Sequence, residues 1–157
     1  ACNGAVVTLE SQLQDGAADA ILCAEVFEHL PEAETTVAVD TLWRVLKPGG
    51  RLVVGVPVEI GPPALAKGLF RALRRPGAFD ARWRHVLAAA AGRPPSERPA
   101  GRIGERRYYG HHLGFDHRRL RATLAARFTP ETERASPFAF LPVWLSSELY
   151  LVYRKAI

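Results

Sequence analysis

Two segments of this 157-residue chain decide its fold: residues 19–31, DAILCAEVFEHLP, and residues 44–54, RVLKPGGRLVV. At 19–24 and at 51–56, Asp19 and Arg51 are each followed by a run of consecutive apolar residues, with Gly55 inside the second run. Such a run is typical of a strand that is covered on both faces of a sheet. We therefore expect two buried strands, close together in the sequence.

The residues between these runs predict a helix. Pro31 and Glu32 suit its first turn, because proline is favoured at the first helical position and acidic residues at the positive end. Its apolar stripe consists of Val39, Leu42, Trp43 and Leu46. Lys47-Pro48 ends the helix, and Gly49-Gly50 supplies a turn. A strand–helix–strand unit implies a parallel sheet, so the predicted class is α/β.

The remaining elements are predicted from the same signals. They are a strand at 5–9, helices at 64–75 and 79–91, an exposed loop at 93–110, a helix capped by Asp116, and a pair of strands at 128–136 and 147–154.

Composition excludes several classes of protein. With 48% hydrophobic and 24% charged residues, the chain is neither collagen-like nor wholly disordered. No apolar run is long enough for a transmembrane helix, and residues 1–4 do not resemble a secretory signal. Cys2 and Cys23 form no disulfide framework, so we expect a reduced, cytoplasmic setting. Because methionine is absent, we expect residue 1 not to be the first residue of the gene.

Positive charge gathers in the second part of the chain. Residues 61–157 carry 18 Lys and Arg against seven Asp and Glu, a balance of +11. A GC-rich genome would explain the arginines, and an anionic partner is the alternative. On the second interpretation, residues 62–112 form an insert that acts as a lid. Four of its arginines would face an anionic acceptor or a membrane surface: Arg74, Arg75, Arg82 and Arg84.

Candidate site residues follow the first buried strand. In parallel α/β sheets, ligands bind beyond the carboxyl ends of the strands, where residues 10–13, 24–30 and 57–61 are expected. The middle segment holds two carboxylates and an imidazole, from Glu25, Glu28 and His29. Alternatively, Glu28 and His29 cap the next helix while Glu25 faces water.

Residues 19–31 and 42–54 resemble class I S-adenosylmethionine-dependent methyltransferases of the type 11 kind. In that family a strand runs into an E-V-L-E-H segment, and a later helix ends in R-V-L-K-P-G-G. The resemblance implies a Rossmann-like sheet of order 3-2-1-4-5-7-6, mostly parallel with an antiparallel last strand. The strands at 5–9, 19–24 and 51–56 would be strands 3, 4 and 5, and the closing pair strands 6 and 7.

Two family features are missing from the sequence. No glycine-rich turn precedes residue 19, and no acidic residue ends a second strand. We therefore expect residues 1–157 to be one partial domain, truncated at the amino end, that binds the cofactor weakly by itself. For the cofactor site, the resemblance implies six residues: Glu10, Ser11, Gln12, Cys23, Ala24 and Glu25.

Some relatives, among them ubiquinone-pathway and small-RNA methyltransferases, bind a divalent ion through an E-x-x-E-H segment. Glu25, Glu28 and His29 match that spacing, and His111-His112 resembles the further histidine of the RNA enzymes. Since metal-free members share the same segment, a metal is kept as the alternative. His29, His111 and His112 are the candidate general bases.

The resemblance implies methyl transfer from S-adenosylmethionine to a small-molecule or lipid-like acceptor. We do not expect a nucleic-acid partner. The alternative is a non-catalytic, methyltransferase-like module that holds a partner on its basic surface. A glycine-rich segment upstream in the gene would favour the enzyme.

Overall fold

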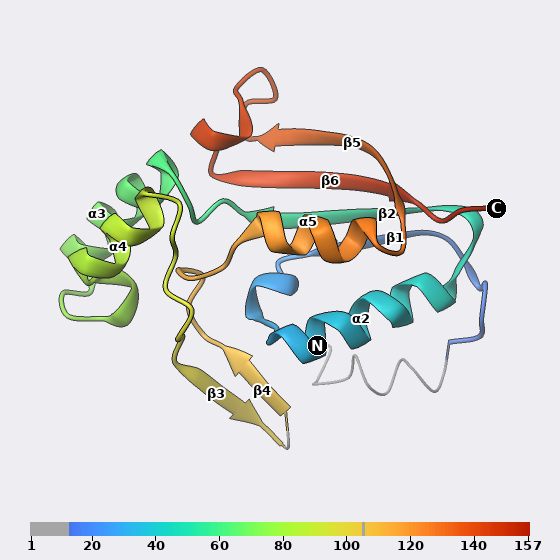
Figure 1. The fold of residues 1–157 in the computed structure, drawn as a ribbon, viewed down its shortest axis with the longest axis horizontal. Coiled ribbons are helices and arrows are strands. Elements are labelled where there is room, and N and C mark those ends of the chain that lie inside the picture. The colour runs from blue at the N-terminus through green and yellow to red at the C-terminus, as the bar shows by residue number, and fades with distance from the viewer. Residues whose placement is uncertain (1–12, 105) are drawn as a thin grey trace.

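The computed structural model describes residues 13–104 and 106–157, and its main sheet has four strands (Figure 1). The strands lie in the order β1-β2-β6-β5, where β1 is Ala18–Ala24, β2 Leu46–Pro57, β5 Thr129–Ser136 and β6 Glu148–Arg154. β1 and β2 are parallel, and β6 is antiparallel to both of its neighbours. This order agrees with strands 4-5-7-6 of the expected sheet. The strand predicted at 5–9 lies outside the described residues.

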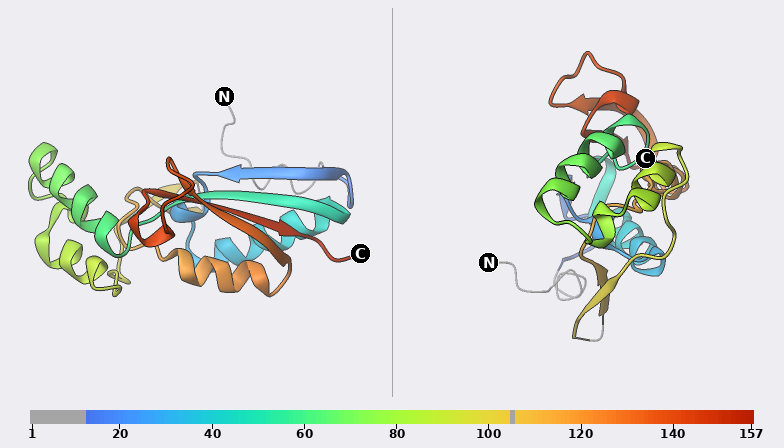
Figure 2. Two further views of the ribbon diagram at one scale, coloured as in Figure 1. Left: turned by 90° about the horizontal axis from the view of Figure 1, so that it is seen from above. Right: turned by 90° about the vertical axis from the view of Figure 1, so that its left-hand side faces the viewer.

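Two helices cover one face of this sheet, α2 (Glu32–Val45) and α5 (His117–Ala125), as Figure 2 shows. The core lies between them and the sheet, where Val39 of α2 and Leu124 of α5 pack with Leu52, Val54 and Leu151. The side chain of Asp116 accepts the amide hydrogen of Arg118, so the predicted cap of α5 is confirmed. None of the helices in the described residues is long and apolar enough to cross a membrane.

The prediction that β1 is covered on both faces is wrong. Its residues alternate in exposure, and 70% of Leu22 is exposed while Ile21 and Cys23 pack against the core. α2 and α5 both lie on the face of the sheet to which Ile21 and Cys23 point (Figure 2). A continuous apolar run therefore marks β1 as a strand without telling how many of its faces are covered.

Lys155 completes the carboxyl end of α2. Its buried ammonium group donates to the carbonyls of Trp43 and Leu46, at 2.7 Å each, and lies 4.0 Å from the centre of the Trp43 ring. A cation at this end of a helix satisfies carbonyls that have no partner within the helix. The helix ends close to the predicted Lys47-Pro48, but Gly49-Gly50 lies inside the span of β2, where the pairing with β1 is shifted.

Residues 62–112, the segment predicted to be an insert, contain α3 (Pro62–Arg74), a short 3-10 helix η2 (Phe79–Ala81) and α4 (Trp83–Ala90). The exposed loop predicted at 93–110 is wrong in part, because β3 (Ala100–Ile103) and β4 (Arg106–Tyr109) pair as an antiparallel hairpin. Gly101 lies opposite Tyr108, and its lack of a side chain leaves room for that ring. Two further 3-10 turns are η1 (Phe27–His29) and η3 (Val143–Leu145).

α3 and α4 pack as a helical hairpin that projects beyond one end of the sheet (Figure 2). Ala64, Val86, Ala89 and Leu113 form a small core of their own at this place. The closest approach is at Gly68, where a Cβ would overlap Cγ1 of Val86 and lie 2.7 Å from its Cγ2. The hairpin therefore depends on a glycine inside a helix.

We predict that Gly68→Ala destabilises the protein. Overpacking costs about 1–3 kcal/mol, more than the roughly 1 kcal/mol of helix propensity that alanine adds. Urea unfolding should show a lower free energy of unfolding, and in a Val86→Ala background the same change should become neutral or stabilising. Equal stabilisation in both backgrounds would contradict the close packing of Gly68 against Val86.

Candidate functional site

The carboxyl ends of β1 and β2 meet at one edge of the sheet. The amide of Glu25, the first residue after β1, donates to the carbonyl of Gly55 at 3.0 Å, and Glu25 adopts a left-handed φ of 56°. The chain then turns into η1, which carries Glu28 and His29. Pro31 is the N-cap of α2, and no side chain caps this helix. The alternative that Glu28 and His29 cap the helix is therefore wrong, although Glu25 is exposed, as that alternative expected.

Glu28 is completely buried, with 0% of its surface exposed. Neither carboxylate oxygen has a hydrogen-bond partner among the described residues. Burial raises the pKa of Glu28 to about 8, and the charge of Glu25 adds to this effect while that of Arg98 opposes it. A carboxylate in such a place needs a proton or a cation, because burying an unpaired charge is costly.

The backbone of β4 fixes the ring of His29. Its Nδ1 lies 2.7 Å from the carbonyl oxygen of Tyr109. Since a carbonyl can only accept, Nδ1 must carry the hydrogen, and in the neutral ring Nε2 keeps its lone pair. Nε2 lies 3.7 Å from Oε1 of Glu28. A backbone carbonyl that orients an imidazole in this way is the usual support of a metal-binding histidine.

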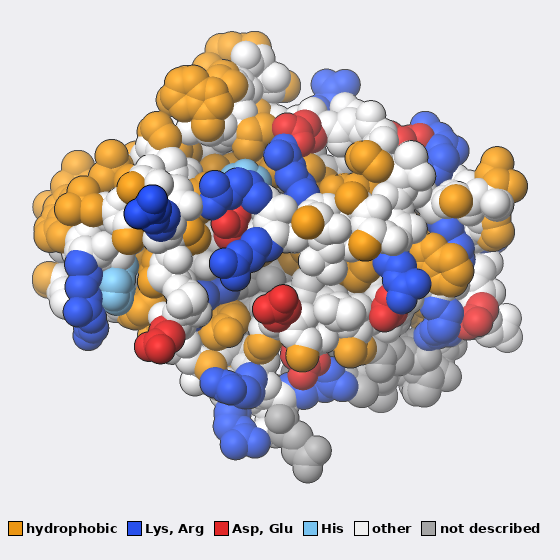
Figure 3. Space-filling view, viewed as in Figure 1, with side chains coloured by type: hydrophobic (Ala, Val, Ile, Leu, Met, Phe, Trp, Pro, Cys, Tyr) orange, Lys and Arg blue, Asp and Glu red, His pale blue; other side chains and the backbone are white. Residues whose placement is uncertain are grey.

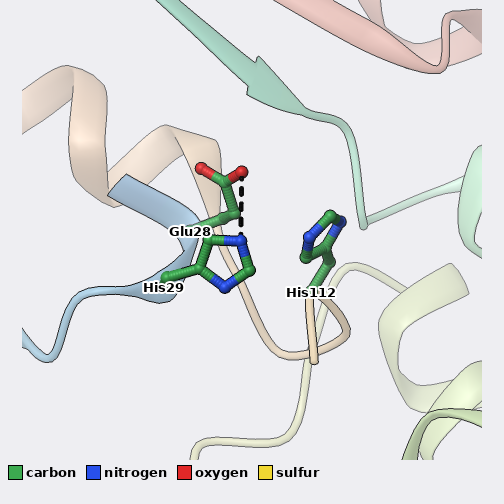
Figure 4. Close-up of side chains that lie close together, drawn as sticks. All are labelled: Glu28, His29 and His112. Carbon is green, nitrogen blue, oxygen red and sulfur yellow. Dashed lines mark ion pairs between the residues drawn. The ribbon is translucent and has the colours of Figure 1, made fainter. Parts of the chain in front are cut away.

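His112 joins this pair from the loop between β4 and α5 (Figure 4). Its ring meets that of His29 edge to face, with 4.9 Å between the ring centres. Burial lowers the pKa of His112, which favours the neutral form that binds metals and accepts protons. Glu28, His29 and His112 each offer a ligand atom, and these atoms all lie within 4.8 Å of one another. We call these three residues the Glu-His-His cluster.

The other predicted site residues lie in different surroundings. His111 is not part of the cluster, and its Nδ1 lies 3.4 Å from Oδ2 of Asp80. Cys23 packs against the core, and burial raises the pKa of its thiol to about 11. Ala24 and Glu25 are exposed at the end of β1. Glu10, Ser11 and Gln12 lie outside the described residues.

A second buried carboxylate, Glu59, follows β2 at the same edge. It is 0% exposed, but Lys67 donates to it at 3.0 Å and Arg71 at 2.8 and 2.9 Å. Burial alone would raise the pKa of Glu59, and these two cations more than offset burial and lower it. Both cations belong to α3, so this ion pair network fastens the hairpin to the end of the sheet.

Asp80 makes similar contacts within the hairpin. Its Oδ2 lies 2.9 Å from Arg75 and 3.4 Å from Arg71. Arg75, which the sequence placed towards an anionic partner, is thus held by a buried carboxylate of its own chain.

Sequence reasoning missed two residues that support the cluster. Arg98 donates to the carbonyls of Glu28 and His111 and stacks 4.2 Å from the centre of the Tyr109 ring. Tyr109 supplies the carbonyl that orients His29. No sequence pattern pointed to either residue. Tyr109 acts through its backbone carbonyl, and Arg98 lies in a proline-rich stretch and binds backbone carbonyls. For Glu59 the sequence did offer a signal, since residues 57–61 were expected at this edge of the sheet.

Comparisons with known proteins agree with this architecture. Residues 3–54 match a family model described as a methyltransferase domain. A segment of 73 residues, 46% of this chain, is 41% identical to a demethylmenaquinone methyltransferase of Deinococcus radiodurans, of which it covers 25%. The chain thus matches about a quarter of the length of that relative.

Solved structures share the fold. An S-adenosylmethionine-dependent methyltransferase of Methanosarcina mazei superimposes with a TM-score of 0.53 at 16% identity, over 92% of this chain and 62% of that one. A protein of Listeria monocytogenes, also described as an S-adenosylmethionine-dependent methyltransferase, gives a TM-score of 0.53 at 12% identity, over 92% and 64%. The described chain spans less than two thirds of either structure.

We predict that the Glu59 network makes stability depend on acid pH. The folded pKa of Glu59 is lowered, so its contribution is fully present above the unfolded value of about 4.3 and is lost as the pH falls through the folded value. Glu59→Gln should lower the free energy of unfolding at pH 7 by about 3 kcal/mol, since two cations lose their partner. It should also flatten the dependence of stability on pH below 5.

The control is Asp19→Asn, which removes an exposed ion pair with Lys47 and should leave stability nearly unchanged. Urea unfolding at several pH values measures both variants. Equal effects of the two changes would contradict a structural role for the network.

Proposed function

Because the chain has the fold and the sequence motifs of class I S-adenosylmethionine-dependent methyltransferases, we propose that the protein transfers a methyl group from S-adenosylmethionine to a small-molecule acceptor. The observation that carries this proposal is the position of the Glu-His-His cluster, at the carboxyl edge of β1 and β2. Ligands of parallel α/β folds bind at this edge. The comparisons do not favour the alternative of a non-catalytic module.

We propose that the cofactor binds beside the carboxyl end of β1. S-adenosylmethionine carries positive charge on its sulfonium and amino groups, and the exposed carboxylate of Glu25 complements that charge. Ala24 presents backbone at the same place, and Cys23 would contribute its backbone, since its side chain turns to the core. Glu10, Ser11 and Gln12 stay predictions for the adenine side. S-adenosylmethionine supplies the electrophilic methyl group, and the protein has to hold the acceptor in line with it.

The Glu-His-His cluster fits a divalent cation. The Glu28 oxygens, which have no hydrogen-bond partner among the described residues, and Nε2 of His29, 3.7 Å from one of them, offer the carboxylate and imidazole donors that suit zinc or manganese. Ligands bound at about 2.1 Å can be at most about 4.2 Å apart, so the cluster would contract slightly on binding. A bound ion would polarise and orient an acceptor oxygen. Glu25 belongs to the predicted metal set of Glu25, Glu28 and His29 but not to the cluster. Its charge raises the pKa of Glu28, and it is proposed as an outer ligand.

The two histidines offer a second route, without a metal. A methyl acceptor loses a proton on reaction, and a neutral imidazole can take it. His29 is held with the lone pair on Nε2, and burial keeps His112 neutral. His111 stays a prediction as a base, with its ring beside Asp80.

Residues 62–112 border the acceptor side of the proposed site. Arg98 binds the backbone of Glu28, and the hairpin reaches the same edge through Glu59. We propose that this insert covers the acceptor, as a lid.

We predict that Glu28→Gln lowers methyl transfer by the intact protein by about 100-fold, because it removes the buried charge that holds the cation. Glu32→Gln, an exposed carboxylate on α2, is the matched control and should keep full activity. Transfer of labelled methyl groups, measured with and without a chelator, tests the metal. Activity should vanish on chelation and return with zinc, manganese or magnesium.

Other results would redirect the proposal. If chelation does nothing while His29→Gln and His112→Gln each lower the rate about 100-fold, the histidines act as bases without a metal. Full activity in all three variants would contradict the assignment of the site.

A further inference from the structure

The α3–α4 hairpin exposes large apolar side chains on one side. Leu65, Leu69 and Leu73 follow at helical spacing along α3, and 76% of Leu73 is exposed. On α4, Trp83 and Leu87 are 51% and 56% exposed. Figure 3 shows hydrophobic side chains gathered at the end of the molecule formed by the hairpin. A contiguous group of this size is unusual on a surface that meets only water.

These residues lie on the same side of the hairpin, as the packing geometry shows. The two helices meet at Gly68 and Val86 and run antiparallel, as the left view of Figure 2 shows. The residue that follows each of these contact positions, Leu69 in α3 and Leu87 in α4, therefore turns to the same side. We call Leu65, Leu69, Leu73, Trp83 and Leu87 the apolar side.

The other side of α3 faces the body of the protein. Lys67 and Arg71 reach Glu59 there, so their charges are used within the chain. The hairpin is thus fastened through its polar side, and the apolar side points away from the sheet. The ion pairs set the position of the hairpin, and in this position Leu65, Leu69 and Leu73 are 41%, 52% and 76% exposed.

The charge of the hairpin is one-sided. Residues 62–92 contain six Lys and Arg and a single acidic residue, Asp80, which is buried. Arg74 is exposed and follows Leu73 in the chain, and Arg82 and Arg84 are exposed on either side of Trp83 in the sequence. A second copy of this surface would place arginine against arginine in a symmetric dimer, which charge repulsion opposes. Apolar side chains edged by cations, with no accessible carboxylate, complement an anionic lipid surface.

We propose that the apolar side of the α3–α4 hairpin docks on the surface of an anionic lipid bilayer. The leucines and Trp83 enter the boundary between headgroups and acyl chains, where tryptophan is favoured. The exposed arginines extend to the lipid phosphates. This docking does not depend on the proposed methyl transfer, since it uses side chains that are not part of the Glu-His-His cluster.

The experiment is flotation of the intact protein with vesicles of phosphatidylcholine, alone or with about 30% phosphatidylglycerol. Binding should need the anionic lipid and weaken with salt. Leu69→Ser combined with Leu73→Ser should abolish binding. Arg82→Gln combined with Arg84→Gln should weaken it about fivefold for each arginine removed.

The matched controls are exposed residues elsewhere. Val37→Ser on α2 and Arg119→Gln combined with Arg134→Gln, on α5 and β5, should bind like the unchanged protein. Circular dichroism verifies that every variant is folded. The proposal is overturned if neither vesicle binds, if neutral vesicles bind equally well, or if the leucine variant still binds. Sedimentation showing a dimer that the leucine changes dissociate, without vesicle binding, would assign the surface to a second copy and also overturn it.

Discussion

The parallel pairing of β1 with β2 is the constraint on which the site depends. It brings two buried carboxylates, Glu28 and Glu59, to one edge of the sheet. The chain neutralises Glu59 with Lys67 and Arg71, but it provides Glu28 with no hydrogen-bond partner among the described residues. Glu59 holds the hairpin in place. In the proposed site, Glu28 is the group that takes up a proton or a cation, because an unpaired buried charge is costly.

The α3–α4 hairpin links this edge to the surface of the protein. Its polar side is fastened through Glu59, and Asp80 of the same hairpin contacts His111, next to His112 in the chain. Its apolar side is left open. A movement of the hairpin would therefore shift the loop that carries His112. This contact connects the proposed docking surface with the proposed site, although each proposal stands without the other.

Local signals in the sequence predicted the α/β class and the cap at Asp116, because apolar runs, proline and capping residues act locally. The order of the four described strands was implied by the resemblance to class I methyltransferases. The sequence also placed Glu28 and His29 at the correct edge. The partners of these residues were out of reach, since Tyr109 acts through its carbonyl and Arg98 through backbone atoms 70 residues away. The sequence did not predict that Leu22 is exposed, because an apolar run does not indicate whether one or both faces of a strand are covered.

The central claim is that the carboxyl edge of β1 and β2 is the place of methyl transfer. A crystal structure of the intact protein with S-adenosylhomocysteine tests it most directly. The account predicts the cofactor sulfur beside Ala24 and Glu25, with open space between it and the rings of His29 and His112. A cofactor bound at another edge of the sheet, or a cluster sealed off from it by side chains, would contradict the account.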